Sequence, residues 1–435
     1  MALLISVLEQ GLIYAIMAFG IYITYKILDF PDLTVDGSFP MGAAIAAALI
    51  SRDVNPLLTL PICFLLGAVV GTLTGLIHVK LKVRDLLSGI IMMTALYTVN
   101  LRIAGRANLP IYNKSTIFQN DLIDKIIPKS LSSFKVVIIV LIITLISKYI
   151  LDWYLRTKSG MLLRAVGDND HIITSLGVNK GKVKVVGLAI SNGLVALSGC
   201  VFAQQQRYFD VSMGTGTMVI GLASVIIGTS LFRKVTILRV TSSVVIGSVI
   251  YKACVAIAIR FGFESTDLKF ITAALFLLIL VHWNGTKQEG QGESRCLNSE
   301  KFINTIILAQ SMKCACSTIL ILKSMTVSLL RLSAATVPEK TSMLNIICGS
   351  IPIDEGAVLI NGTNITNMPE YKRMGRIGRV FQNPSMGTCP SMTILENMAM
   401  AENKGKAYNL GKGVNQKKRR SLPRVAPSAE SRTGR

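Results

Sequence analysis

The sequence predicts an α-helical polytopic membrane protein with about eight or nine spanning or re-entrant helices, followed by an incomplete α/β domain fragment and a disordered tail. Hydrophobic residues make up 51% of the 435 residues and charged residues only 16%, whereas about a quarter of the residues in soluble domains are charged. Apolar runs long enough to cross a bilayer follow one another as far as Trp283. The composition then becomes polar, which separates residues 1–283 from the rest of the chain.

Nine apolar stretches are candidate spans, because a helix of about 20 mostly apolar residues crosses a bilayer. The second and seventh are short and rich in glycine, so we interpret them as broken or re-entrant segments. The stretches are 8–28, 37–51, 56–79, 84–104, 134–155, 184–205, 214–231, 237–259 and 267–283.

Basic residues gather in three connecting segments, 78–84, 156–184 and 232–239. Lys and Arg are enriched in cytoplasmic loops, so we expect these segments and the tail after Trp283 in the cytoplasm of a multi-pass plasma-membrane protein. The basic residues of the 105–133 loop count against this orientation. The net charge of +22 then reflects a cytoplasmic membrane face, and we expect no nucleic-acid partner.

Polar residues interrupt the apolar pattern before the two short segments. Asp29, Asp32 and Asp36 lie beside proline and glycine, which predicts a helix break, with Thr34 or Asp36 capping the next helix. A similar polar and glycine-rich stretch spans 204–216, and pairs of broken segments are typical of transporters. Buried charges at membrane depth tend to be functional, while a structural turn at the interface is the alternative. The candidates for a solute path are Asp32, Asp36, Ser38, Asn192 and Asp210.

The loop 159–178 predicts an amphipathic helix that could dock a soluble partner or could simply connect two spans at the interface. No hydrolytic triad, carboxylate pair or metal cage is recognisable in 1–283, where His78, His171 and His282 are isolated. We therefore expect no enzyme activity, metal or cofactor in this part.

Three stretches, LDFPDLTVDGSFPMGAA, SGMLLRAVGDNDHIITSLGVNKGKVKVVGLAISNGLVALSG and GLASVIIGTSLF, resemble permease subunits of bacterial ABC importers of the branched-chain amino acid and ribose type, especially those paired with a binding lipoprotein. The resemblance covers about 1–283. It implies ATP-driven alternating access for a small solute, an amino acid, between two permease copies. It also implies partner ATPase subunits, which bind ATP and Mg, and a substrate-binding lipoprotein. The loop then contains the coupling helix that docks the ATPase, with the residues Gly160, Leu163, Arg164, Ala165, Gly167, Asp168 and Asn169.

A second resemblance begins at Met343, where DEGAVLINGTNIT and VFQNP are similar to the first half of an ABC ATPase. It implies a partial ATPase domain with a degraded P-loop over 321–403. The composition predicts a polar linker over 284–320 and a basic, disordered tail over 404–435, which has too few apolar residues to fold alone. Lys340 and Thr341 then take the P-loop Lys and hydroxyl positions, and Gln382 takes the Q-loop position, as vestigial nucleotide-binding residues.

The P-loop itself is degraded, because a G-x-x-x-x-G-K-[ST] motif needs glycines whose N–H groups surround the phosphates. Here Pro338 removes a donor and Glu339 adds a negative charge. Allowed codons for 321–340 can spell a complete P-loop in a shifted reading frame, which predicts a frameshift corrected near 340–342. The five residues at the hidden glycine positions, Val327, Ala334, Ala335, Val337 and Glu339, all have codons that begin with G.

Two other interpretations remain open. One is a fused permease–ATPase, which the missing signature and Walker B motifs disfavour. The other is a secondary transporter or channel with a non-functional tail, in which Asp32, Asp36 and Asp210 would couple an ion.

Overall fold

The computed structural model describes residues 2–119, 134–232, 239–261, 273–274, 277, 344–353, 356–360, 363–381, 384–406 and 408–414. The chain divides into two compact units. The first consists of Met1–Phe276 and Asn367–Arg435, and the second of Leu277–Thr366. Within the second unit, the strands β3 (Leu359–Ile360) and β4 (Thr363–Asn364) pair antiparallel.

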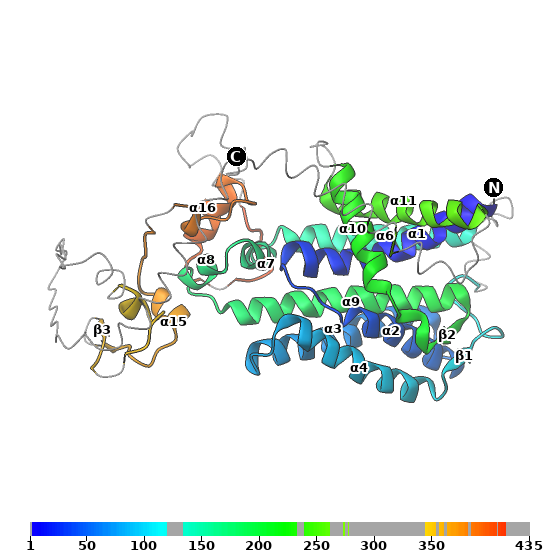
Figure 1. The fold of residues 1–435 in the computed structure, drawn as a ribbon, viewed down its shortest axis with the longest axis horizontal. Coiled ribbons are helices and arrows are strands. Elements are labelled where there is room, and N and C mark those ends of the chain that lie inside the picture. The colour runs from blue at the N-terminus through cyan, green and yellow to red at the C-terminus, as the bar shows by residue number, and fades with distance from the viewer. Residues whose placement is uncertain are drawn as a thin grey trace. The chain divides into compact units, whose positions relative to one another are not determined.

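The membrane part of the first unit is helical (Figure 1). Seven of its described helices are long and apolar enough to cross a membrane, and α2 is a shorter apolar helix. This confirms a multi-pass helical membrane protein, and the predicted span 267–283 lies almost entirely outside the described residues. The helices are α1 (Ala2–Ile21), which continues as the π-helix η1 (Tyr22–Ile27), α2 (Val35–Ser51), α3 (Pro56–Lys80), α4 (Asp85–Ala104), α6 (Lys135–Leu155), α9 (Lys180–Gln206), α10 (Thr217–Leu231) and α11 (Val240–Arg260).

Helix α9 is the centre of the bundle, because α1, α2 and α3 all pack against it. Small residues allow this close approach. A Cβ added at Gly42 of α2 would collide with the carbonyl oxygen of Ala196, and one added at Gly71 of α3 would collide with that of Leu188. Helices in lipid associate through such small-residue contacts, since apolar burial alone gives them little driving force.

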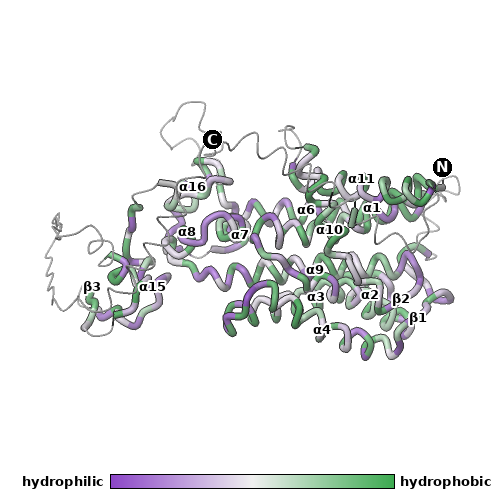
Figure 2. Tube along the Cα trace, in the orientation of Figure 1, coloured by the Kyte–Doolittle hydropathy of each residue, from purple (hydrophilic) through white to green (hydrophobic). Residues whose placement is uncertain are grey.

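The outer faces of the bundle are apolar as well. Large hydrophobic side chains are exposed on α3, α4 and α6, for example Leu65, Ile91 and Ile146. Figure 2 shows long hydrophobic stretches along these helices, whereas α9 begins with a hydrophilic turn that contains Lys180, Lys182 and Lys184. An apolar exterior on helices of this length is what a lipid environment requires.

Both predicted breaks in the bundle are present. Residues 28–34 separate η1 from α2, and the 3-10 helix η3 (Val211–Gly214) precedes α10. Strand β1 (Asn108–Pro110) pairs antiparallel with β2 (Tyr208–Asp210), which leads into η3. The two short segments therefore start from irregular backbone that needs hydrogen-bond partners from neighbouring helices.

The connection between α6 and α9 forms two short helices, α7 (Lys158–Asp168) and α8 (Asp170–Ser175). The first unit also contains α15 (Glu370–Met374), the 3-10 helix η6 (Pro384–Gly387) and α16 (Ile394–Glu402). We call residues 384–406 and 408–414 the C-terminal segment. Although the sequence predicts disorder from residue 404, residues 408–414 are hydrogen-bonded to the start of α7, for instance through the carbonyl oxygens of Asn409 and Gly411.

Candidate functional site

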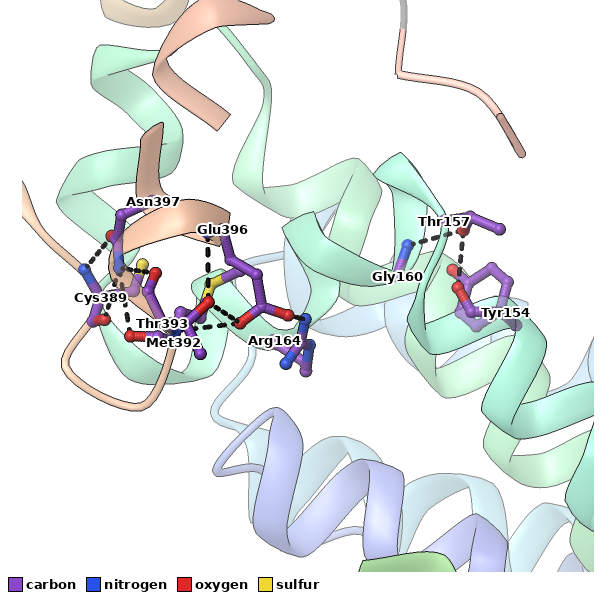
Figure 3. Close-up of polar contacts among 9 residues, drawn as sticks. All are labelled: Tyr154, Thr157, Gly160, Arg164, Cys389, Met392, Thr393, Glu396 and Asn397. Carbon is purple, nitrogen blue, oxygen red and sulfur yellow. Dashed lines mark hydrogen bonds and ion pairs between the residues drawn. The ribbon is translucent and has the colours of Figure 1, made fainter. Parts of the chain in front are cut away.

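Helix α7 is the amphipathic helix that the sequence predicts. Thr157 caps its N-terminus, since the hydroxyl accepts a hydrogen bond from the Gly160 N–H at 3.2 Å and donates one to the Tyr154 carbonyl at 2.6 Å (Figure 3). The apolar face of α7 is buried, and its members are Met161, Leu162, Leu163, Ala165 and Val166.

Two predicted docking residues, Gly160 and Gly167, instead hold α7 against the membrane helices. A Cβ at Gly160 would collide with the Tyr154 carbonyl oxygen, and one at Gly167 would collide with the carbonyl oxygen of Ile27 at the end of η1. Leu163 and Ala165 are fully buried beside them. These four residues therefore position the helix, while Arg164, Asp168 and Asn169 remain to contact a partner.

Those three polar residues contact the C-terminal segment. The Arg164 guanidinium donates to the Glu396 carboxylate of α16 (Figure 3). Asp168 accepts a hydrogen bond from the Ser391 N–H at 2.9 Å. The Asn169 amide donates to the Met386 carbonyl oxygen at 3.2 Å. The polar face that the sequence assigns to partner docking thus makes a set of hydrogen bonds within the same chain.

The predicted solute-path residues fall into three separate places. Asp32, Ser38 and Asn192 form one buried network: the Asn192 amide donates to Asp32 at 2.8 Å, and the Ser38 hydroxyl donates to the Asn192 amide oxygen at 2.7 Å. Asp32 also accepts from the Thr34 N–H at 2.9 Å. All are at most 1% exposed. This network joins the break before α2 to the centre of α9, which is a structural role.

Asp36 has a different position. Its carboxylate accepts from the N–H groups of Gly216 and Met218, at 3.1 and 2.7 Å, and from the Thr217 hydroxyl at 2.9 Å. Asp36 therefore caps α10 from the first turn of α2. The expectation that Asp36 caps its own helix is wrong, because Asp36 lies inside α2 and its carboxylate bonds to the free N–H groups at the start of α10. Thr34 is the N-cap residue of α2, but its side chain makes no capping hydrogen bond.

A cavity of about 420 Å³ lies beside this cap and is lined by α2, α4 and the η3–α10 corner. Its wall includes Asp36, Met93, Tyr97, Asn100 and Thr215. Asn100 was missed from the sequence, because a lone Asn in an apolar helix gives no distinctive signal. Its amide N–H donates to the Gly37 carbonyl oxygen at 3.1 Å, while its buried amide oxygen has no partner among the described residues.

Asp210 is the third place. It lies at the end of β2, accepts hydrogen bonds from Ser212 and Asn108, and does not line the cavity. The bonds from Ser212 and Asn108 outweigh partial burial and hold the pKa of Asp210 below its usual value. The vestigial nucleotide-binding residues Lys340, Thr341 and Gln382 lie outside the described residues. No group of three metal-ligating side chains occurs within the part of the chain that the structure describes.

Replacing Asn192 by Leu should destabilise the bundle by about 3 kcal/mol, because the buried Asp32 carboxylate would lose a hydrogen-bond partner. Thermal unfolding of the purified protein in detergent measures this change. The control is Ser191→Ala on the same helix, which removes one hydrogen bond to the Gly20 carbonyl oxygen and should cost only about 1 kcal/mol. Equal losses for the two variants would contradict a special role for Asp32.

The comparisons with known proteins agree with this membrane fold. The chain is 43% identical over 281 residues to the tyrosine transport system permease protein of Clostridioides difficile (strain R20291). The aligned region covers 65% of this chain and 91% of that protein. It is 27% identical over 226 residues to the ribose import permease protein RbsC of Escherichia coli (strain K12), covering 52% and 68% of the two chains.

A further 51-residue stretch is 51% identical to the tyrosine transport ATP-binding protein of the same Clostridioides difficile strain, covering 12% of this chain and 20% of that protein. No solved structure is significantly similar to the chain. The family model described as branched-chain amino acid transport system / permease component matches residues 3–282. The chain therefore belongs to this family of ABC importer permeases, and residues 3–282 are its membrane permease.

Proposed function

We propose that this chain is the permease of an importer for an amino acid with an aromatic side chain, such as tyrosine. One observation carries the proposal: two parts of the chain are similar to two components, permease and ATP-binding protein, of one tyrosine transport system. A shared relative for both parts favours one transport system over an accidental join of unrelated sequences. Such a permease is not itself an enzyme, because hydrolysis of ATP belongs to its partner.

The working assembly contains two copies of this permease, separate ATPase subunits that bind ATP and Mg, and a substrate-binding lipoprotein. In this arrangement α7 is the coupling helix, and the connection between α6 and α9, which contains α7 and α8, faces the cytoplasm. The basic turn at the start of α9, with Lys180, Lys182 and Lys184, supports that orientation. Closure of the ATPase pair on ATP would move the coupling helices and alternate access to the solute path.

The cavity beside Asp36 is our candidate for part of the solute path. Its volume of about 420 Å³ is within the range of small-molecule sites. Met93, Pro40 and Tyr97 give it an apolar wall suited to an aromatic ring. The amide oxygen of Asn100 is buried and has no partner among the described residues, so a small shift of the side chains around it would let it accept a hydrogen bond from the ammonium group of a solute. Asp36 itself is engaged by the N-terminus of α10, so it shapes the cavity and leaves Asn100 as the polar contact.

The fused part after residue 283 is, on this proposal, the start of the partner's reading frame. The similarity of a 51-residue stretch of this chain to an ATP-binding protein supports this origin. Lys340, Thr341 and Gln382 would be relics of a nucleotide site that this chain cannot complete, because Pro338 lacks a backbone N–H for the phosphate and Glu339 brings a negative charge towards it.

Tyrosine uptake should depend on ATP. Proteoliposomes would contain this chain, the tyrosine transport ATP-binding protein of Clostridioides difficile and a tyrosine-binding lipoprotein. We expect labelled tyrosine to enter only with ATP, and ionophores that collapse proton and sodium gradients should leave the rate unchanged. Uptake that follows the ion gradient and ignores ATP would favour the secondary-transporter alternative.

Replacing Asn100 by Ala should raise the KM for uptake about tenfold, since one hydrogen bond to a charged group contributes roughly 1.5 kcal/mol. The matched control is Asn55→Ala, which removes only the N-cap of α3 at a site outside the cavity. Thermal stability is measured for both variants to separate binding from folding. An unchanged KM for a stably folded Asn100→Ala protein would contradict this placement of the path.

The nucleotide sequence that encodes residues 280–435 tests the origin of the tail. We expect the shifted frame to spell a P-loop just before the codon of Lys340, followed downstream by a signature motif and a Walker B strand. Codons at 327, 334, 335, 337 and 339 that cannot be read as glycine in that frame would contradict the frameshift.

A further inference from the structure

The polar face of α7 that should receive a separate ATPase is already in contact with the chain's own C-terminal segment. Arg164, Asp168 and Asn169 each hydrogen-bond to it, and their partners are spread over three different parts of the segment: α16, the loop before α16, and η6. These three are the predicted docking residues that do not pack α7 against the membrane helices. The segment therefore covers the docking face itself.

Apolar packing accompanies these polar contacts. Met161, Leu162 and Leu163 of α7 belong to the same buried cluster as three residues of the segment, Cys389, Met392 and Met400. The side chains of Cys389 and Met392 are fully buried there. Surface contacts between charged groups contribute little by themselves, so this burial is what makes the association of the segment with α7 stable.

Glu396 links the segment's internal structure to this contact. Its carboxylate accepts from the Thr393 N–H at 3.0 Å in a capping box at the start of α16, and it also accepts from Arg164. In addition, the Asn397 amide bonds to both the N–H and the carbonyl oxygen of Cys389, at 2.8 and 3.0 Å (Figure 3). These bonds fix the loop before α16, so that the Ser391 N–H reaches Asp168.

The end of the segment closes the first turn of α7. The N–H groups of Lys158 and Ser159 donate to the carbonyl oxygens of Gly411 and Asn409, at 3.0 and 3.3 Å. First-turn N–H groups have no acceptor inside their own helix. The Gly413 N–H in turn donates to the Arg156 carbonyl oxygen at 3.1 Å. Slow exchange of the Lys158 and Ser159 amides with solvent therefore reports on the presence of the segment.

We propose that the C-terminal segment is an intramolecular cover that competes with the separate ATPase for α7 and so restrains ATP-driven transport by the intact chain. The inference rests on the proposed function, because it takes α7 as the ATPase docking helix. A tethered segment acts at a high effective concentration. A partner that needs the uncovered state binds with an affinity reduced by the fraction of chains that are uncovered.

Two full-length variants make the test. The disrupting variant combines Glu396→Arg, which opposes Arg164, with Gly413→Val, whose Cβ would collide with the Met161 sulfur. The control combines Glu402→Arg, at an exposed position near the end of α16, with Gly378→Val, at an exposed glycine where an added Cβ would meet no atom within 4 Å. Neither variant alters α7 itself, so the surface offered to an ATPase is unchanged.

The first measurement is hydrogen exchange, followed by mass spectrometry on the peptide that contains Lys158 and Ser159. We expect slow exchange in the intact chain and in the control, and about tenfold faster exchange in the disrupting variant. Equal exchange in all three proteins overturns the proposal. This measurement needs no ATPase, so its failure is distinct from failure of the proposed function.

The second measurement is binding of the tyrosine transport ATP-binding protein of Clostridioides difficile to the same proteins in nanodiscs. We expect about tenfold tighter binding to the disrupting variant than to the intact chain or the control. Equal, measurable binding to all three overturns the competition. Absence of binding to all three, together with exchange that is faster only in the disrupting variant, overturns the proposed function and leaves the cover itself in place.

Discussion

The hydrogen bond from the Asn192 amide to the Asp32 carboxylate is the contact on which the arrangement of the permease depends. An interrupted helix inside a bilayer leaves polar groups that lipid cannot satisfy. Here the interruption at 28–34 is stabilised by a carboxylate that a central side chain of α9 binds directly. With this break fixed, α2 starts where the Asp36 carboxylate reaches the N-terminus of α10. The two broken segments are thereby joined at one place, and the cavity lies beside that junction.

The sequence predicts this membrane architecture well where a single chemical pattern decides it. The apolar stretches 56–79, 84–104 and 134–155 differ by at most one residue at each end from α3, α4 and α6, because length and hydropathy are local properties. The breaks are equally local, since Pro, Gly and Asp are poor residues for a helix interior. What the pattern cannot supply is the partner of each buried polar group. Asp36 and α10 are about 180 residues apart, and only the packing of α2 on the η3–α10 corner brings them together.

In the candidate site, too, the sequence predicts the local helix but not the contacts that its residues make. The amphipathic pattern of the loop 159–178 predicts a helix that docks a soluble partner or connects two spans, and the structure confirms an amphipathic helix, α7, in this loop. The resemblance to ABC importer permeases groups Gly160 and Gly167 with Arg164 and Asp168 as docking residues. In the structure, the glycines pack against backbone of the membrane helices, whereas the two charged residues bond to the C-terminal segment. Sequence spacing cannot separate packing residues from docking residues, because a short helix uses one face to pack on the membrane helices and the other to contact a partner. Asn100 was missed because its role depends on the tertiary structure: it lines the cavity, and its buried amide oxygen has no hydrogen-bond partner among the described residues.

The contact between the C-terminal segment and α7 stabilises both of its sides. Met392 and Met400 are apolar side chains of the segment, and without a partner surface they would face solvent. In this chain those residues are buried against α7, and the Glu396 carboxylate is paired with Arg164. Burial acts to raise the pKa of Glu396, but Arg164 and the hydrogen bonds from Thr393 outweigh it and hold the pKa below its usual value. The carboxylate therefore stays ionised at neutral pH. The contact stabilises both sides, because it buries the apolar side chains of the segment and gives hydrogen-bond partners to the polar face and the first-turn N–H groups of α7.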